Sequence, residues 1–197
     1  MSGKLALVNV LLPGYFQWLG KNKLKFKASS TVTLIQDQGH NILVDTGNEE
    51  VEKYLLKALN KQGLKPENID YLIITHHHPD HVGNKHLFKK AIKTDYLTSY
   101  KDEQFLIDFD IINKGKNIIT DNISVISTPG HSLDSCSVIT KTDKGIIVVA
   151  GDLFVKKQEE KNLVIQNKKE YNKNKKKIIK LADYIIPGHG DMFKVKK

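Results

Sequence analysis

The sequence has no arginine, and all 31 of its basic residues are lysine. Arginine carries the planar fork that proteins prefer for recognising phosphates and bases. The formal net charge of +9 still favours polyanionic partners. Charge alone therefore leaves two interpretations open. The protein binds nucleic acid, or, more simply, the lysines reflect a biased amino-acid composition.

Cysteine and long apolar runs are also scarce. The single Cys136 excludes an intramolecular disulfide and a cysteine-only zinc site. It fits a reducing compartment, and we expect it to be a small buried residue rather than a nucleophile. No apolar run has the length of a membrane span. The alternating apolar residues after Leu5 predict a strand rather than a signal peptide, so we expect a cytoplasmic protein without a membrane partner.

Length and composition are those of an ordinary globular domain. The chain has 197 residues, of which 40% are hydrophobic and 27% are charged. No linker rich in proline, glycine or serine divides it. The sequence therefore predicts a single domain over residues 1–197.

Apolar runs and turn residues predict most of the secondary structure. Expected strands are Leu5–Leu12, Thr31–Gln36, Ile42–Val44, Tyr71–Ile74, Ile123–Ile126, Ser137–Thr140, Ile146–Ala150 and Tyr184–Ile186. Residues Asn48–Gln62 have helical periodicity, with acidic residues first, lysines near the end and Gly63 just beyond. A short helix is expected to begin near Asn84. Lys156–Leu181 is expected to be a loop followed by an amphipathic helix.

The segment THHHPDHVGN, Thr75–Asn84, concentrates ionisable side chains directly after an apolar strand. Zinc binds neutral imidazole and carboxylate oxygen, and a catalytic site leaves one position for water. Four residues of the segment offer such groups: His76, His78, Asp80 and His81. A single tight loop cannot surround two ions, so further ligands must come from elsewhere in the chain.

Three later residues are suitable partners: His131, Asp152 and His189. Each lies beside a glycine that permits a tight turn. The natural partition gives one metal His76, His78 and His131, and the other metal Asp80, His81 and His189. Asp152 bridges the two metals, together with a hydroxide that is the nucleophile. Both halves of the chain place polar residues after apolar strands, which is a hint of internal duplication.

Other polar and aromatic residues have competing interpretations. Asp45 is expected to orient a ligand histidine, or else to cap a nearby turn. His77 is expected to point away from the metals, and His40 and His86 to be structural or solvated. The aromatic residues between Tyr15 and Trp18 could form a lip over the metals or pack in the core. The lysines in 173–180 could contact RNA or form a solvated helix face.

Five short motifs follow one another in a fixed order. They are ILVDTG (Ile42–Gly47), THHHPDHVG (Thr75–Gly83), TPGHS (Thr128–Ser132), VVAGDLF (Val148–Phe154) and IIPGHG (Ile185–Gly190). In this order the chain resembles the metallo-β-lactamase-fold hydrolases over almost its whole length. The resemblance implies an αβ/βα four-layer sandwich, in which two β-sheets are flanked by helices and the metals lie at one edge between the sheets.

Two longer stretches of sequence indicate one group within this family. LLPGYFQW (Leu11–Trp18) and ADYIIPGHGDMFKV (Ala182–Val195) are similar to the group of metallo-β-lactamase-domain-containing protein 1. That resemblance implies a small single-domain hydrolase, with endoribonuclease activity reported for animal members. Asp152 stands where class B β-lactamases use residues such as Cys or Ser, so we expect lactam hydrolysis to be a side activity. After His131, the segment Ser132-Leu133-Asp134 replaces the small residues that more commonly follow the ligand histidine, and Asp134 is expected to alter the polarity of the pocket.

We therefore expect a di-zinc hydrolase, with iron or manganese open as native metals. Asp80 is the expected catalytic residue, which orients the nucleophile and relays its proton to the leaving group. The first substrate hypothesis is a small ester, thioester, lactone or lactam, favoured by a chain too short for an extra nucleic-acid domain. The second is single-stranded RNA, cut by an endoribonuclease. A third is an iron-dependent oxygenase of the same fold. The sequence leaves monomer and homodimer open.

Overall fold

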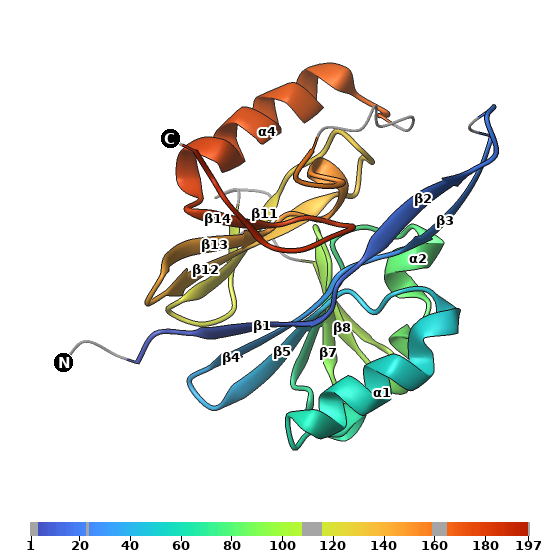
Figure 1. Ribbon diagram of the computed structural model, residues 1–197. Helices are drawn as coiled ribbons and strands as arrows, with labels where there is room; N and C mark the ends of the chain where they lie inside the picture. Colours follow the sequence, from blue (N-terminus) through green and yellow to red (C-terminus); the bar gives the residue numbers. More distant parts are fainter. Residues whose placement is uncertain (1–3, 23, 108–115, 159–164, 197) are drawn as a thin grey trace.

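The computed structural model describes residues 4–22, 24–107, 116–158 and 165–196 (Figure 1). The first sheet contains, in spatial order, β1 (Leu7–Leu12), β4 (Val32–Asp37), β5 (His40–Val44), β6 (Tyr71–Ile73), β7 (Ile92–Thr94), β8 (Thr98–Lys101) and β9 (Gln104–Ile107). The second contains β10 (Lys116–Ile118), β11 (Ile123–Ser127), β12 (Cys136–Thr142), β13 (Gly145–Val149), β14 (Tyr184–Ile186) and β15 (Phe193–Lys194). A separate ribbon pairs β2 (Tyr15–Leu19) with β3 (Lys25–Ser29).

Helices cover the outer faces of both sheets (Figure 1). The α-helices are α1 (Glu52–Lys61), the short α2 (Pro79–Val82) and α4 (Lys168–Leu181). Short 3₁₀ turns are η1 (Glu49–Val51), η2 (Pro66–Asn68), η3 (Lys85–Leu87) and η4 (Gly151–Leu153). Helix α1 buries Leu55 and Leu59 completely against the first sheet. Each such side chain contributes about 1.5–3 kcal/mol of stability.

Apolar side chains from both sheets fill the space between them. This core contains Ile35, Val44 and Ile73 from the first sheet, and Val125 and Val149 from the second. Helix α4 closes the other side, where its Ile178 packs with residues of β13 and β14. The layers are thus helix, sheet, sheet and helix, which confirms the predicted αβ/βα sandwich. That residues 1–197 form a single domain stays a prediction.

The same connection occurs once in each sheet. In the first sheet, an antiparallel hairpin of β4 and β5 is followed by α1 and then by β6, parallel to β5. In the second sheet, the hairpin of β12 and β13 is followed by α4 and then by β14, parallel to β13. The two halves that look alike in sequence therefore also have like topology.

The predicted strands are confirmed, with shifts of at most two residues at their ends, and the first helix is confirmed as α1, which starts four residues later than predicted because η1 precedes it. The short helix expected to begin near Asn84 is confirmed in place as η3, which is a 3₁₀ helix with Asn84 as its N-cap, whereas the preceding α2, which begins at Pro79, was not predicted. Proline favours the first helical position, while the buried Asn84 side chain donates to the carbonyl groups of Thr46 and Asn48. The amphipathic helix is confirmed as α4, and residues 159–164 of the loop before it lie outside the described residues.

Several short strands were not predicted, namely β2, β3, β7, β8, β9, β10 and β15. Most contain lysine and other polar residues, and they are too short to show alternation clearly. Among the described residues, no helix combines the length and apolar character needed to cross a membrane.

Candidate metal centre

Four strands deliver polar side chains to one end of the molecule. Asp45 follows β5 and the histidine cluster follows β6, while Asp152 follows β13 and His189 follows β14. Strands β5 and β6 are parallel, as are β13 and β14, so each pair ends at one sheet edge. Sites in α/β folds commonly form at such carboxyl ends. Here the two edges face each other and bring the seven predicted ligands into one cluster.

Three histidines form the first group. The Nδ1 atom of His78 lies 3.0 Å from Nε2 of His76 and 3.1 Å from Nε2 of His131. The potential ligand atoms of this group lie within 4.8 Å of one another. His76 and His131 are buried, whereas His78 is partly exposed. This is the first set that the sequence predicts.

The second group surrounds His189. Its Nε2 atom lies 3.5 Å from Oδ2 of Asp80 and 3.2 Å from Oδ1 of Asp152. The Nε2 atom of His81 lies 3.4 Å from the same Asp152 oxygen. Asp80, His81 and His189 are again within 4.8 Å of one another. The second predicted set is thus also assembled.

Asp152 lies between the two groups. Its Oδ2 atom is 3.5 Å from Nε2 of His131, while its Oδ1 atom faces His81 and His189. The carboxylate therefore presents one oxygen to each group. This is the geometry expected of a residue that bridges two cations.

Hydrogen bonds to the far side of two rings fix their tautomers. The Asp45 carboxylate accepts from Nδ1 of His81 at 2.8 Å, and also from the main chain and hydroxyl of Thr75. The Nδ1 atom of His189 lies 3.0 Å and 3.1 Å from the carbonyl oxygens of Ser29 and Tyr15. Because carboxylates and carbonyls only accept, each Nδ1 carries the proton and each Nε2 is left as a ligand. Among the described residues, the N–H groups of the turn beside Asp45 have other acceptors, since Thr46 donates to the His81 carbonyl and Gly47 to the Ser30 hydroxyl.

The donor set fits divalent metal ions. In a tetrahedral zinc site with Zn–N bonds of about 2.0–2.1 Å, two ligand nitrogens are about 3.3 Å apart. The separations around His78 are close to this value. Nε2 of His81 is buried and makes no hydrogen bond with any described residue. Buried polar atoms normally have partners, and a cation would supply one here.

Burial and neighbouring charges set the protonation of the cluster. Burial lowers the pKa of His76 well below its usual value, and His81 adds to this effect. Burial also disfavours the charged form of His81, but the carboxylates of Asp45 and Asp152 outweigh it and raise the pKa. For Asp152, His189 and His81 outweigh burial and lower the pKa. A metal binding to His81 must therefore displace a proton.

Glycines let the backbone approach the cluster closely. A Cβ atom on Gly188 would overlap Oδ1 of Asp152, and one on Gly151 would lie 2.7 Å from Oγ1 of Thr75. The Gly188 N–H donates to the carbonyls of Gly151 and Phe154, at 3.0 Å and 2.9 Å. These bonds join the segment of Asp152 to the segment of His189.

The aromatic residues form a ribbon beside the site rather than part of the core. The Phe16 ring lies 5.8 Å from the His189 ring and stacks on Phe26 at 5.1 Å, with Trp18 on its edge at 5.0 Å. Nζ of Lys156 donates to the Phe16 carbonyl at 2.8 Å. The alternative of core packing is wrong, because none of these rings belongs to a described core cluster.

Thr75 and Lys156 lie beside the cluster but were not predicted as site residues. The hydroxyl of Thr75 donates to Asp45 at 2.7 Å and lies 3.3 Å from ring nitrogens of His76 and His81. Its place immediately before the histidines was the only signal. For Lys156 there was none, since it is one lysine among many.

The remaining candidates lie outside the cluster. His77 is half-exposed and pairs with Asp134, whose hydrogen bond raises the pKa of His77. His40 lies beside Asp70, and the exposed His86 lies beside Glu52. Cys136 is fully buried, and burial raises the pKa of its thiol, as expected of a structural residue.

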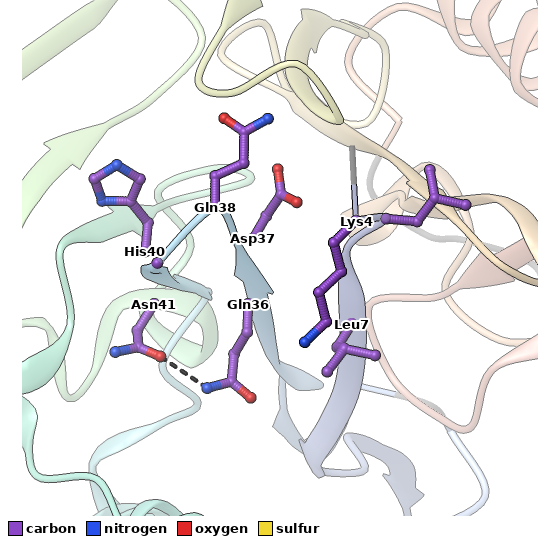
Figure 2. Close-up of a pocket in the computed structure, with 9 residues that line it drawn as sticks. Lys4, Leu7, Gln36, Asp37, Gln38, His40 and Asn41 are labelled. Atoms are coloured by element: carbon purple, nitrogen blue, oxygen red, sulfur yellow. Dashed lines mark hydrogen bonds between the residues drawn. The ribbon is translucent and has the colours of Figure 1, made fainter. Parts of the chain in front are cut away.

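A separate pocket of about 360 Å³ adjoins the turn between β4 and β5 (Figure 2). Its lining includes Lys4, Gln36 and His40, which begins β5. Asp45 follows the other end of the same strand. The pocket is therefore at the opposite end of the sheet from the metal-ligand groups.

Comparison with known proteins identifies similar chains. The profile of the Metallo-beta-lactamase superfamily matches residues 27–189. Metallo-beta-lactamase domain-containing protein 1 of Xenopus laevis is 33% identical, over 96% of this chain and 82% of that protein. Its counterpart in Mus musculus is 32% identical, over 98% and 85%. A probable metallo-hydrolase of Methanocaldococcus jannaschii is 35% identical, over 79% and 74%.

Solved structures share the fold at lower identity. A putative metallo-beta-lactamase from Thermotoga maritima has a TM-score of 0.67 and 19% identity, covering 96% of this chain and 99% of that chain. An N-acyl homoserine lactone hydrolase, with its product bound at the catalytic metal centre, has a TM-score of 0.67 and 18% identity, covering 96% and 94%. At this identity the likeness establishes the arrangement of sheets and helices.

Proposed function

Because the chain belongs to the metallo-beta-lactamase superfamily of metal-dependent hydrolases, and within it to the group of metallo-beta-lactamase domain-containing protein 1, we propose that its cluster holds two divalent metal ions. The single observation that carries this proposal is Asp152, which faces a different ligand group with each oxygen. Zinc is the proposed metal, since imidazole and carboxylate are its ordinary ligands.

The chemistry follows from the donor set. Divalent ions held here would lower the pKa of a coordinated water from about 15.7 toward about 7 and polarise a substrate oxygen. The Asp80 carboxylate is partly exposed and 3.5 Å from Nε2 of His189, so it can accept the proton of the attacking water. It then returns this proton to the leaving group. Asp45 keeps His81 in the ligand tautomer throughout.

The proposed substrate is a small ester, thioester, lactone or lactam. The ribbon carries Phe16 against the ring of His189, which gives the site an apolar side suited to an acyl group. A lactone hydrolase with its product at the metal centre shares the fold. We propose the cytoplasm as the compartment, on the ground that the only cysteine is a buried free thiol.

Endoribonuclease activity is the second candidate, and a basic groove favours it. The groove has a volume of about 340 Å³, and five lysines line it: Lys156, Lys157, Lys175, Lys194 and Lys196. Among the described residues, no acidic side chain is in its lining. It adjoins the site because the main chain of Val155 pairs with that of His189 at 2.9 Å. Phosphates of single-stranded RNA are the polyanion that such a groove would attract.

One experiment tests the site and separates the candidates. Zinc-loaded protein is compared with Asp80→Ala, His78→Ala and Asp152→Ala, each purified identically, on single-stranded RNA and on a panel of esters, thioesters and lactones. We expect acyl hydrolysis by the wild type, lost together with metal in His78→Ala and Asp152→Ala. Full turnover by metal-free Asp152→Ala would contradict the metal centre. RNA cleavage by the wild type alone would make the second candidate the function.

Metal analysis of protein purified without added metal provides a further check. Zinc or manganese is consistent with hydrolysis. Stoichiometric iron, with oxygen consumption and no hydrolysis, would instead assign the chain to oxygenase chemistry on the same fold.

A further inference from the structure

Asp134 contacts the histidine loop from the other half of the molecule. It lies three residues after His131, on the connection that leads into β12. Its Oδ2 atom accepts from the main-chain N–H of His77 at 3.0 Å and from Nδ1 of His77 at 2.8 Å. One carboxylate oxygen thus binds both the backbone and the ring of one residue.

The contact between Asp134 and His77 affects the metal ligands because of where His77 lies in the chain. His77 lies between His76 and His78, which are two of the three residues of the first ligand group, and His131 is the third. The ring of His77 has no place in that group. Through Asp134, however, His77 joins the loop of the first sheet to the loop that carries His131.

Neighbouring bonds hold Asp134 itself in place. The Cys136 N–H donates to the carbonyl of Thr75 at 2.8 Å, which pairs the two loops directly beside the contact. The hydroxyls of Ser132 and Ser135 lie 2.7 Å apart on either side of Asp134. The turn that carries the Asp134 carboxylate is therefore held by hydrogen bonds of its neighbouring residues.

We propose that Asp134 is a positioning residue, which holds the His76–His78 loop at the separation from His131 that the first metal ion requires. The proposal rests on the proposed two-metal centre. It is specific to the first group, because the second group has other supports. His81 is held by Asp45, and His189 by the carbonyls of Tyr15 and Ser29.

Three variants separate the parts of this contact. Asp134→Ala removes both hydrogen bonds. Asp134→Asn keeps an oxygen that can accept from the His77 main chain. His77→Ala removes the ring and keeps its main-chain N–H. Asp143→Ala is the matched control, because this exposed residue lies in the turn between β12 and β13, at the opposite end of β13 from Asp152.

The measurement is stepwise zinc affinity, by competition with a chromophoric chelator, together with the melting temperature of each metal-free variant. Changes to residues that orient metal ligands typically weaken metal binding about 10- to 100-fold. We expect Asp134→Ala to weaken one of the two zinc ions by this factor and to leave the other within about twofold. Asp134→Asn and His77→Ala should each recover part of the loss, and Asp143→Ala should match the wild type.

The outcomes distinguish this proposal from the one on which it rests. If the wild type binds no zinc, the two-metal centre is wrong. If the wild type binds two ions and Asp134→Ala binds both with unchanged affinity, only the positioning role is wrong. Equal weakening of both ions, or no recovery in Asp134→Asn, would also overturn it, since either result indicates general loss of structure.

Discussion

At the scale of the residue, the site depends on side chains in unusual backbone positions. Asp45 has a φ of +57°, a region that few residues other than glycine adopt, although Asp tolerates it better than most. This turn directs its carboxylate at the N–H and hydroxyl of Thr75 and at His81. Three donors compensate the burial of one charge. The strained conformation is thus stabilised by the contacts that it creates.

Gly188 is the residue whose replacement tests the bridging carboxylate most directly. The added methyl of Gly188→Ala would overlap Oδ1 of Asp152. We expect the variant to fold and to lose at least about tenfold in metal affinity, the lower end of the usual effect of displaced supports. Hydrolytic activity should fall with it. Chelator competition and circular dichroism measure the two properties.

Gly39→Ala is the control for this prediction. Gly39 has a φ of +84°, and an added Cβ would meet no atom within 4 Å. The substitution should cost about 1 kcal/mol of stability through backbone strain alone. Its metal affinity should equal that of the wild type. If both variants lose metal equally, the close approach of Gly188 to Asp152 is not the cause.

At the scale of the element, the β2–β3 ribbon is an addition to the sandwich with two roles. Its carbonyls orient His189, and its aromatic side chains lie next to that ring. The ribbon is paired to itself rather than to either sheet. Strand β2 alternates exposed and partly buried residues, and its partly buried side chains are Phe16 and Trp18. An element of this kind can contact a substrate without supporting the core.

Phe16→Ala tests the ribbon as a substrate contact. Loss of the ring removes apolar contact that is made equally in the ground state and the transition state. We therefore expect KM for a long-chain acyl substrate to rise up to about tenfold, which corresponds to about 1.4 kcal/mol, with kcat nearly unchanged. Steady-state kinetics on a long-chain and an acetyl ester measure this, and the acetyl ester should show little change. Phe105→Ala, at a ring 70% exposed on β9, is the control. A fall in kcat with unchanged KM would contradict the contact.

At the scale of the whole molecule, the cluster joins the two sheets. His76, His78, Asp80 and His81 follow β6 of the first sheet, while His131, Asp152 and His189 follow strands of the second. Each of the two ligand groups combines residues from both sheets. Metal ions bound there would act as links across the interface, and the unfolded chain would not retain them with the same affinity.

Metal should therefore stabilise the fold. One ion at a free concentration 100 times its Kd adds about 2.7 kcal/mol. At about 2–4 °C per kcal/mol for a chain of this size, each site should raise Tm by roughly 5–10 °C. Thermal unfolding with increasing zinc, and after chelation, measures the shift. A Tm that is independent of zinc would contradict two bound ions, and Asp152→Ala should show the smallest shift.

The sequence by itself determined the kind of residues at the site and their order. The strands that lead into the site, β5, β6, β13 and β14, contain apolar runs, and polar residues follow each of them. Polar residues occur there because the carboxyl end of a buried strand is where the chain reaches solvent again. Strand period and residue chemistry are local properties, so they are visible without a structure. The two ligand sets and the orienting Asp45 follow from such patterns, whereas the two layers of sheet were implied by the resemblance to the metallo-β-lactamase-fold hydrolases.

Tertiary structure decided the contacts between distant segments. The two oxygens of Asp152 point at different histidine groups only because the two sheets face each other. The same packing brings Asp134 to His77 and the carbonyls of the ribbon to His189. Asp134 and His77 are 57 positions apart in the sequence, and His189 and Ser29 are 160 positions apart. No local pattern encodes such distances, because they result from how whole layers pack.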